Sequence, residues 1–94
     1  MSIGKVAIIG LGLLGGSIGL AVKARAPGII TSGYDAEPQV RERATARGLA
    51  DAVCDSAAEA VRDADLVILC VPVGAMRAAA GEIAGALAPQ AIVS

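Results

Sequence analysis

Five glycines interrupt the aliphatic stretch 6–23, which reads VAIIGLGLLGGSIGLAVK, and they constrain the fold more than any other feature of the chain. A glycine inside a regular helix or strand costs about 0.5–1 kcal/mol relative to alanine. A segment that formed only a buried strand or helix would therefore avoid them. Because the first glycine follows directly on the apolar run 5–9, the spacing indicates a strand, a tight turn and then a helix.

Apolar runs of strand length alternate with helical patterns along the rest of the chain. Strands are predicted over 5–9, 29–34, 51–54, 65–71 and 91–94, and helices over 14–26, 37–47, 56–64 and 75–88. In the third helix, Ser56 and Glu59 have the spacing of a capping box. Strands and helices in alternation are typical of an α/β fold. We therefore expect one Rossmann-type, doubly wound parallel sheet of about five strands, with helices on both faces, over residues 1–94.

The glycines between the first strand and the first helix form the motif G-x-G-x-x-G, with Gly10, Gly12 and Gly15 as its fixed positions. In such a motif the first glycine permits a sharp turn, and the second lets a diphosphate approach the backbone. The third brings the helix close to the sheet. The start of the helix then directs free N–H groups and the positive end of its dipole at the anion. These residues predict a dinucleotide site that needs no lysine.

An acidic residue at the end of the second strand supports this prediction. Asp35 lies twenty residues after Gly15, where a carboxylate can accept hydrogen bonds from both hydroxyls of an adenosine ribose. A carboxylate also repels a 2′-phosphate, and the next residue is Ala36 rather than an arginine. Glu37 adds further negative charge. We therefore expect NAD rather than NADP as the cofactor.

The net charge argues against a nucleic-acid-binding protein, and the histidine and cysteine content argues against a zinc-binding one. A net charge of −1 with interleaved acids and bases offers no broad positive surface for nucleic acid. No histidine and only two cysteines leave too few ligands for a metal site. Cys70 lies in the run LVILCVPV and is interpreted as a small buried thiol, which fits a reducing cytoplasm. The apolar stretch imitates a secretory signal, but five glycines within residues 10–22 weaken a continuous apolar helix. The spacings Gly12/Gly16 and Gly15/Gly19 match a membrane-helix pattern, but the apolar run is too short to span a bilayer.

Two residues after the fourth predicted strand are further candidates. Val71 and Pro72 fall at the carboxyl edge of the sheet, where ligands of open α/β sheets bind. Pro72 could equally do no more than end the strand. Arg77 could face the same cleft, although an exposed position on its helix is the simpler interpretation.

The segments IIGLGLLGGSIGLAVK, GYD at 33–35 and ADLVILCVPV at 64–73 resemble the N-terminal nucleotide-binding domain of the prephenate and arogenate dehydrogenase family. The resemblance extends from residue 3 to residue 94, and Gly15-Gly16-Ser17 is its most specific part. It implies that the diphosphate loop consists of Gly10, Gly12, Leu13, Leu14 and Gly15. It also implies that Asp35 holds the ribose and that Val71 and Pro72 flank the far half of NAD.

The same resemblance implies oxidative decarboxylation of prephenate or arogenate, with hydride passing to NAD, in tyrosine biosynthesis. It places the catalytic histidine, the small-molecule substrate pocket and a helical domain that forms a homodimer beyond the last strand, so these 94 residues alone are expected to be inactive. No nucleic-acid or membrane partner is expected. Two alternatives stay open: another NAD(P)-dependent enzyme of the β-hydroxyacid dehydrogenase or pyrroline-5-carboxylate reductase type, and a non-catalytic NAD-sensing module.

Overall fold

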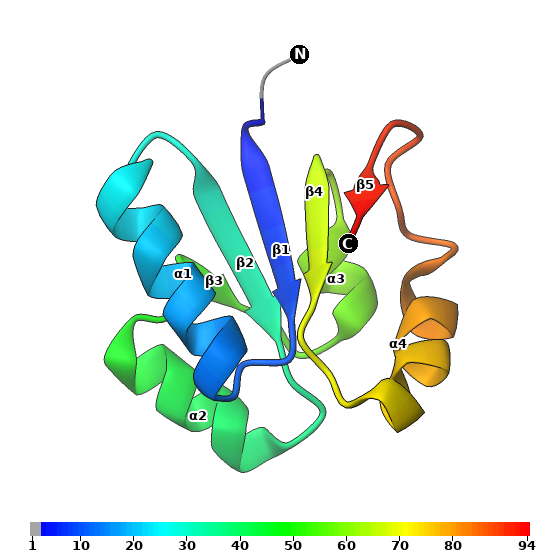
Figure 1. Cartoon of the computed structure of the whole chain (residues 1–94), viewed down its shortest axis with the longest axis horizontal. Helices are drawn as coiled ribbons and strands as arrows, with labels where there is room; N and C mark the ends of the chain where they lie inside the picture. The colour runs from blue at the N-terminus through cyan, green and yellow to red at the C-terminus, as the bar shows by residue number, and fades with distance from the viewer. Residues whose placement is uncertain (1–2) are drawn as a thin grey trace.

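A five-stranded parallel sheet lies between two layers of helices in the computed structural model, which describes residues 3–94 (Figure 1). The strands are β1 (Lys5–Ile9), β2 (Ile30–Tyr34), β3 (Ala52–Val53), β4 (Leu66–Leu69) and β5 (Ile92–Val93). The helices are α1 (Leu13–Arg25), α2 (Pro38–Arg47), α3 (Ala57–Val61) and α4 (Met76–Ile83). The strand order is β3-β2-β1-β4-β5, which is the doubly wound order in which the chain reverses direction beside β1. The predicted fold class is confirmed; Met1 and Ser2 of the expected domain lie outside the described residues.

The central strand β1 shows why the sheet needs helices on both sides. Alternate side chains of a strand point to opposite faces. Val6 and Ile8 pack in a cluster with residues of α2 and its flanking loops, including Ala44 and Leu49. Ala7 and Ile9 pack in the other cluster, which lies under α3 and α4. Figure 1 shows α1 and α2 on one side of the sheet and α3 and α4 on the other.

Helix α1 packs mainly through glycines, and of its aliphatic side chains Ile18 is partly buried against the core. Its buried residues are Gly15, Gly16 and Gly19, whereas Leu14 and Leu20 are exposed. A Cβ at Gly19 would overlap the carbonyl oxygen of Leu49, so the helix approaches this loop closely enough to exclude any side chain. The glycine spacing that resembles a membrane-helix motif therefore serves packing within the domain. Over residues 3–94, no helix combines the length and apolarity required to cross a bilayer.

Several predicted element boundaries were too wide. Helix α3 ends at Val61 rather than at 64, because Asp63 adopts a left-handed conformation with φ 60°. Helix α4 ends at Ile83 rather than at 88 and follows a 3₁₀ turn over Val73–Ala75. Glycines at 81 and 85 weaken helix continuation there. Strand β4 ends at Leu69 rather than at 71, since Pro72 has no N–H to donate to the sheet.

Only half of the predicted capping box forms at the start of α3. The hydroxyl of Ser56 accepts a hydrogen bond of 3.1 Å from the backbone N–H of Glu59. In the part of the chain that the structure describes, the Glu59 carboxylate accepts no hydrogen bond from the N–H of Ser56. Ser56 is nevertheless confirmed as the N-cap.

The start of β4 is joined to the start of β1 through the carboxylate of Asp65. One oxygen of this carboxylate accepts hydrogen bonds from the N–H of Gly4 at 2.7 Å and of Lys5 at 3.1 Å. These bonds hold the pKa of Asp65 below its usual range, with the bond from Gly4 as the larger cause. The two bonds therefore stabilise the folded state in which Asp65 is ionised.

The lowered pKa predicts an acid sensitivity that Asp65→Asn should reduce. The unfolded chain has an ordinary Asp pKa of about 3.9, so the stabilisation is complete above this pH and disappears as the pH falls through the lower folded-state pKa. The urea midpoint should fall less between pH 6 and pH 2.5 in Asp65→Asn than in the wild type. Asp63→Asn is the matched control and should retain the wild-type dependence. If the urea midpoint fell equally with pH in the wild type and in both variants, the stabilising role of the ionised Asp65 carboxylate would be contradicted.

Candidate cofactor-binding site

The turn after β1 is held between the ends of β2 and β4. Gly10 has φ 101°, a left-handed conformation that favours glycine, and its N–H donates to the carbonyl of Tyr34 at 2.7 Å. A Cβ at Gly10 would overlap the carbonyl oxygen of Cys70, which lies just beyond β4. Gly10 therefore allows both the turn and the close approach of a neighbouring backbone, in agreement with its predicted role.

Gly15 brings α1 against this turn. A Cβ at Gly15 would overlap the carbonyl oxygen of Gly10 and would lie 3.3 Å from Cγ2 of Ile8 in β1. No side chain can be accommodated at position 15 unless the helix moves away from the turn. The start of α1 consequently lies directly beside the backbone bend, which is the arrangement that the motif predicts.

Gly12 differs from Gly10 and Gly15 because the packing of the protein would leave room for a side chain at this position. A Cβ at Gly12 would meet no protein atom within 4 Å. Its backbone angles, φ −71° and ψ −156°, are extended and open to any residue. The space over Gly12 is therefore free for a ligand that approaches the backbone closely.

The first turn of α1 presents backbone donors beside this space. The first helical hydrogen bond runs from the N–H of Gly16 to the carbonyl of Gly12 at 2.8 Å. The N–H groups of Leu13, Leu14 and Gly15 precede that bond and have no acceptor within the helix. Leu13 and Leu14 in this turn are 95% and 66% exposed. Such a helix start suits an anion.

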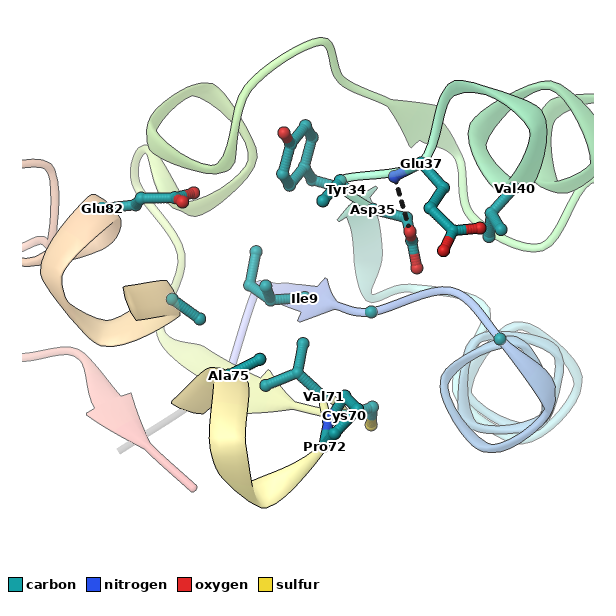
Figure 2. Close-up of a pocket in the computed structure, with 14 residues that line it drawn as sticks. Ile9, Tyr34, Asp35, Glu37, Val40, Cys70, Val71, Pro72, Ala75 and Glu82 are labelled. Carbon is teal, nitrogen blue, oxygen red and sulfur yellow. Dashed lines mark hydrogen bonds between the residues drawn. The ribbon is translucent and has the colours of Figure 1, made fainter. Parts of the chain in front are cut away.

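Asp35 directly follows β2 and is hydrogen-bonded to the glycine turn. One carboxylate oxygen accepts from the N–H of Leu11 at 2.9 Å. The other accepts from the N–H of Glu37 at 2.9 Å (Figure 2). Each oxygen retains lone pairs for further donors. The two bonds fix the carboxylate at the mouth of the bend, which is the position predicted for the ribose acceptor.

Arg41 in α2 stabilises the loop that carries Asp35, a role that sequence reasoning missed. Its Nη1 donates to the carbonyl of Asp35 at 2.8 Å, and its guanidinium lies 5.5 Å from the centre of the Tyr34 ring. A basic residue at the third or fourth position of the second helix is the only sequence signal for this contact. The guanidinium is thus engaged by the backbone and the aromatic ring.

These groups surround a cleft of about 470 Å³ at the carboxyl ends of β1, β2 and β4 (Figure 2). Gly10, Gly12 and Asp35 line one end, and Val71 and Pro72 belong to the opposite wall, so five of the predicted site residues share one cavity. Leu14 and Gly15 are not among the lining residues, and Leu13 faces a smaller cavity of about 150 Å³ between α1 and α2. Lining residues that sequence reasoning missed are Ile9, Tyr34, Val40, Ala75, Ala79 and Glu82.

Cys70 also lines the cleft and is therefore only partly buried, which corrects the prediction of a fully buried thiol. It follows the last residue of β4, where the sheet opens to the cavity. Burial nevertheless raises the pKa of its thiol, so the group is protonated at neutral pH. Cys54 is buried, and neither cysteine forms a disulfide. Cys70 is thus a neutral wall residue of the cleft.

The backbone bend, the helix start aimed at open space and the acid at the end of the neighbouring strand meet at the switch point of a doubly wound parallel sheet. This is the architecture of a nucleotide-binding domain of the Rossmann type. The model of the family "Prephenate dehydrogenase, nucleotide-binding domain" matches residues 18–94. The chain belongs to this family.

Individual relatives agree with the family assignment. Over 88 residues, 94% of this chain, it is 50% identical to a cyclohexadienyl dehydrogenase of Zymomonas mobilis, of which it covers 30%. The prephenate dehydrogenase of A. aeolicus in complex with hydroxyphenyl propionate and NAD⁺ superposes with a TM-score of 0.86 at 27% identity, over 99% of this chain and 33% of that one. Synechocystis arogenate dehydrogenase superposes with a TM-score of 0.80 at 29% identity, over 95% and 31%. The chain thus spans about a third of the length of these relatives.

Proposed function

We propose that this chain is the NAD-binding part of a prephenate or arogenate dehydrogenase. The observation that carries the proposal is the open space over Gly12, where a side chain would meet no protein atom within 4 Å. Packing within the protein therefore does not explain a glycine at this position, whereas a diphosphate that approaches the backbone would. The N–H groups of Leu13, Leu14 and Gly15 would hold the diphosphate, and Gly10 shapes the bend beneath it. The diphosphate would thus be held by backbone groups alone.

The two walls of the cleft would hold the rest of the cofactor. Asp35 would accept hydrogen bonds from the adenosine ribose. Val71 and Pro72 form the opposite wall, along which the dinucleotide would continue toward its nicotinamide. When bound, the nicotinamide would accept a hydride from the substrate. This chain's own residues bind and orient the cofactor.

The charges around the ribose position favour NAD over NADP. The carboxylate of Asp35 would repel a 2′-phosphate, and the Glu37 side chain adds a second negative charge at the same end of the cleft. Arg41, the nearby cation, donates to backbone carbonyls and lies over Tyr34. These contacts engage Nη1 and one face of the guanidinium.

For the longer protein we propose oxidative decarboxylation of prephenate or arogenate in tyrosine biosynthesis. The names of the relatives support this reaction. A positioned base of suitable pKa is needed to oxidise an alcohol, and this chain has no histidine. We therefore propose that the base, the substrate pocket and the contacts of a homodimer belong to the length of the relatives that this chain does not span. Two free thiols fit a cytoplasmic location.

Calorimetric titration of the chain with NAD and with NADP tests the proposal, and Asp35→Ala identifies the discriminating residue. NAD should bind more tightly than NADP to the wild type. Asp35→Ala should lose about 10- to 100-fold in NAD affinity, the value of one or two hydrogen bonds to a charged group, and should narrow the NAD:NADP ratio. Asp55→Ala, which removes an exposed acid outside the cleft, should leave both values unchanged.

Two results would count against this assignment. Absence of NAD binding to the folded wild-type chain would contradict the proposed function. An unchanged NAD:NADP ratio in Asp35→Ala would show that another group recognises the ribose.

A further inference from the structure

The end of the cleft away from the glycine turn is mainly apolar. Its walls include Tyr34 and Ile9 together with Ala75 and Ala79, and the carboxylate of Glu82 borders it. The polar groups that would hold the diphosphate and ribose lie at the other end. An apolar compartment with one acceptor at its edge is suited to a flat heterocycle that carries one donor.

Helix α4 and the 3₁₀ turn before it contribute three residues to this compartment. Ala75, Ala79 and Glu82 are spaced four and three residues apart, which places them on the same side of a helix. The two alanines leave width for a ring beside the helix. Figure 2 shows the Glu82 side chain extending from α4 toward the side on which Tyr34 lies, at the border of the cavity.

The carboxylate of Glu82 has no structural task in the described part of the chain. Among residues 3–94 no hydrogen bond or ion pair holds it, whereas Asp35, Asp51 and Asp65 all accept hydrogen bonds from backbone N–H groups. An ionised carboxylate is an acceptor only, so its ligand partner must be a donor.

We propose that Glu82 accepts a hydrogen bond from the exocyclic amine of adenine and thereby makes this cleft selective for an adenine dinucleotide. The inference rests on the proposed function, because it assumes that the adenosine half of NAD occupies the cleft. The 6-amino group is the one donor on the base. Hypoxanthine carries a carbonyl oxygen at the same position, and two acceptors facing each other repel; the N1–H donor of hypoxanthine lies at the neighbouring ring position.

Nicotinamide hypoxanthine dinucleotide, which differs from NAD only in the base, provides the test. Calorimetry of the 94-residue chain should show NAD binding about tenfold more tightly than the hypoxanthine analogue, the value of one hydrogen bond to a charged group. In Glu82→Gln the amide can donate to the hypoxanthine carbonyl, so the ratio should fall to about one or invert. Glu82→Ala, which has neither donor nor acceptor, should also lose the preference.

Glu42→Gln is the matched control, because it makes the same change on an exposed position of α2 that lines neither cavity. It should keep the wild-type ratio. Equal wild-type affinity for the two dinucleotides, or a tenfold preference that survives in Glu82→Gln, would overturn the role of Glu82 while NAD binding itself stands. Failure of the folded wild-type chain to bind either dinucleotide would instead overturn the proposed function, and the inference with it.

Discussion

Gly12→Val is expected to weaken NAD binding by at least about 100-fold, roughly 3 kcal/mol, while the chain remains folded. The branched side chain would occupy the space over the bend in which we place the diphosphate. The protein tolerates it, because a Cβ at Gly12 meets no protein atom within 4 Å and the backbone there is extended. Valine is a poor N-cap for α1 and should cost only about 1 kcal/mol of stability. Calorimetry gives the affinity, and urea unfolding gives the stability.

Gly28→Val is the matched control for this experiment. Gly28 lies between α1 and β2, and a Cβ there also meets nothing within 4 Å. The substitution should change neither NAD affinity nor stability to a large extent. Undiminished NAD affinity in Gly12→Val would place the diphosphate elsewhere on the molecule.

Gly15→Ala is expected to have the opposite pattern, with a large loss of stability caused by a single methyl group. The new Cβ would overlap the carbonyl oxygen of Gly10. The Cβ is fixed to the helix backbone and the oxygen belongs to the backbone of the turn, so no side-chain rotation can relieve the overlap. Helix α1 must then move from the turn, which we expect to reduce the free energy of unfolding by about 3 kcal/mol, the upper range for an overpacked site. This is a large part of the 5–15 kcal/mol that is typical of a whole domain.

Thermal and urea unfolding measure this effect. For a domain of this size, about 3 kcal/mol corresponds to a fall in Tm of about 12–24 °C. Gly12→Ala, which adds the same methyl group to the same motif at an open position, should lose only about 1 kcal/mol through its weaker N-cap. If Gly15→Ala and Gly12→Ala were equally stable, the close approach of α1 to the bend would be wrong.

The elements of the fold could be predicted because they depend on local properties of the chain. Apolar runs of strand length and helical spacing placed the strands and helices of residues 3–94 in the right order. Gly48, which follows the last residue of α2, adopts the left-handed C-cap conformation with φ 61°. The ends of α3, α4 and β4 were predicted less well, since fraying and 3₁₀ turns depend on what the last residues contact.

The residues that line the cleft follow from the sequence to different extents, for a physical reason. Gly10, Gly12 and Asp35 belong to a motif in which spacing places each of them at the turn or at the end of the neighbouring strand. The glycine motif and its acid give no signal for Tyr34, Ala79 and Glu82. They line the cleft only because β2 and α4, more than forty residues apart in the chain, meet at the same edge of the sheet.

By itself, the amino-acid sequence determined the alternation of strands and helices, the backbone bend and the acid that faces it, because glycine spacing and apolar periodicity act over a few residues. The tertiary structure alone decided that α1 packs on the glycines at 15, 16 and 19 with its leucines outward, and that Asp35 bonds to the N–H of Leu11. It also decided which side chains of α4 face the cleft. Such contacts join segments distant in the chain, and their geometry depends on how closely two backbones approach.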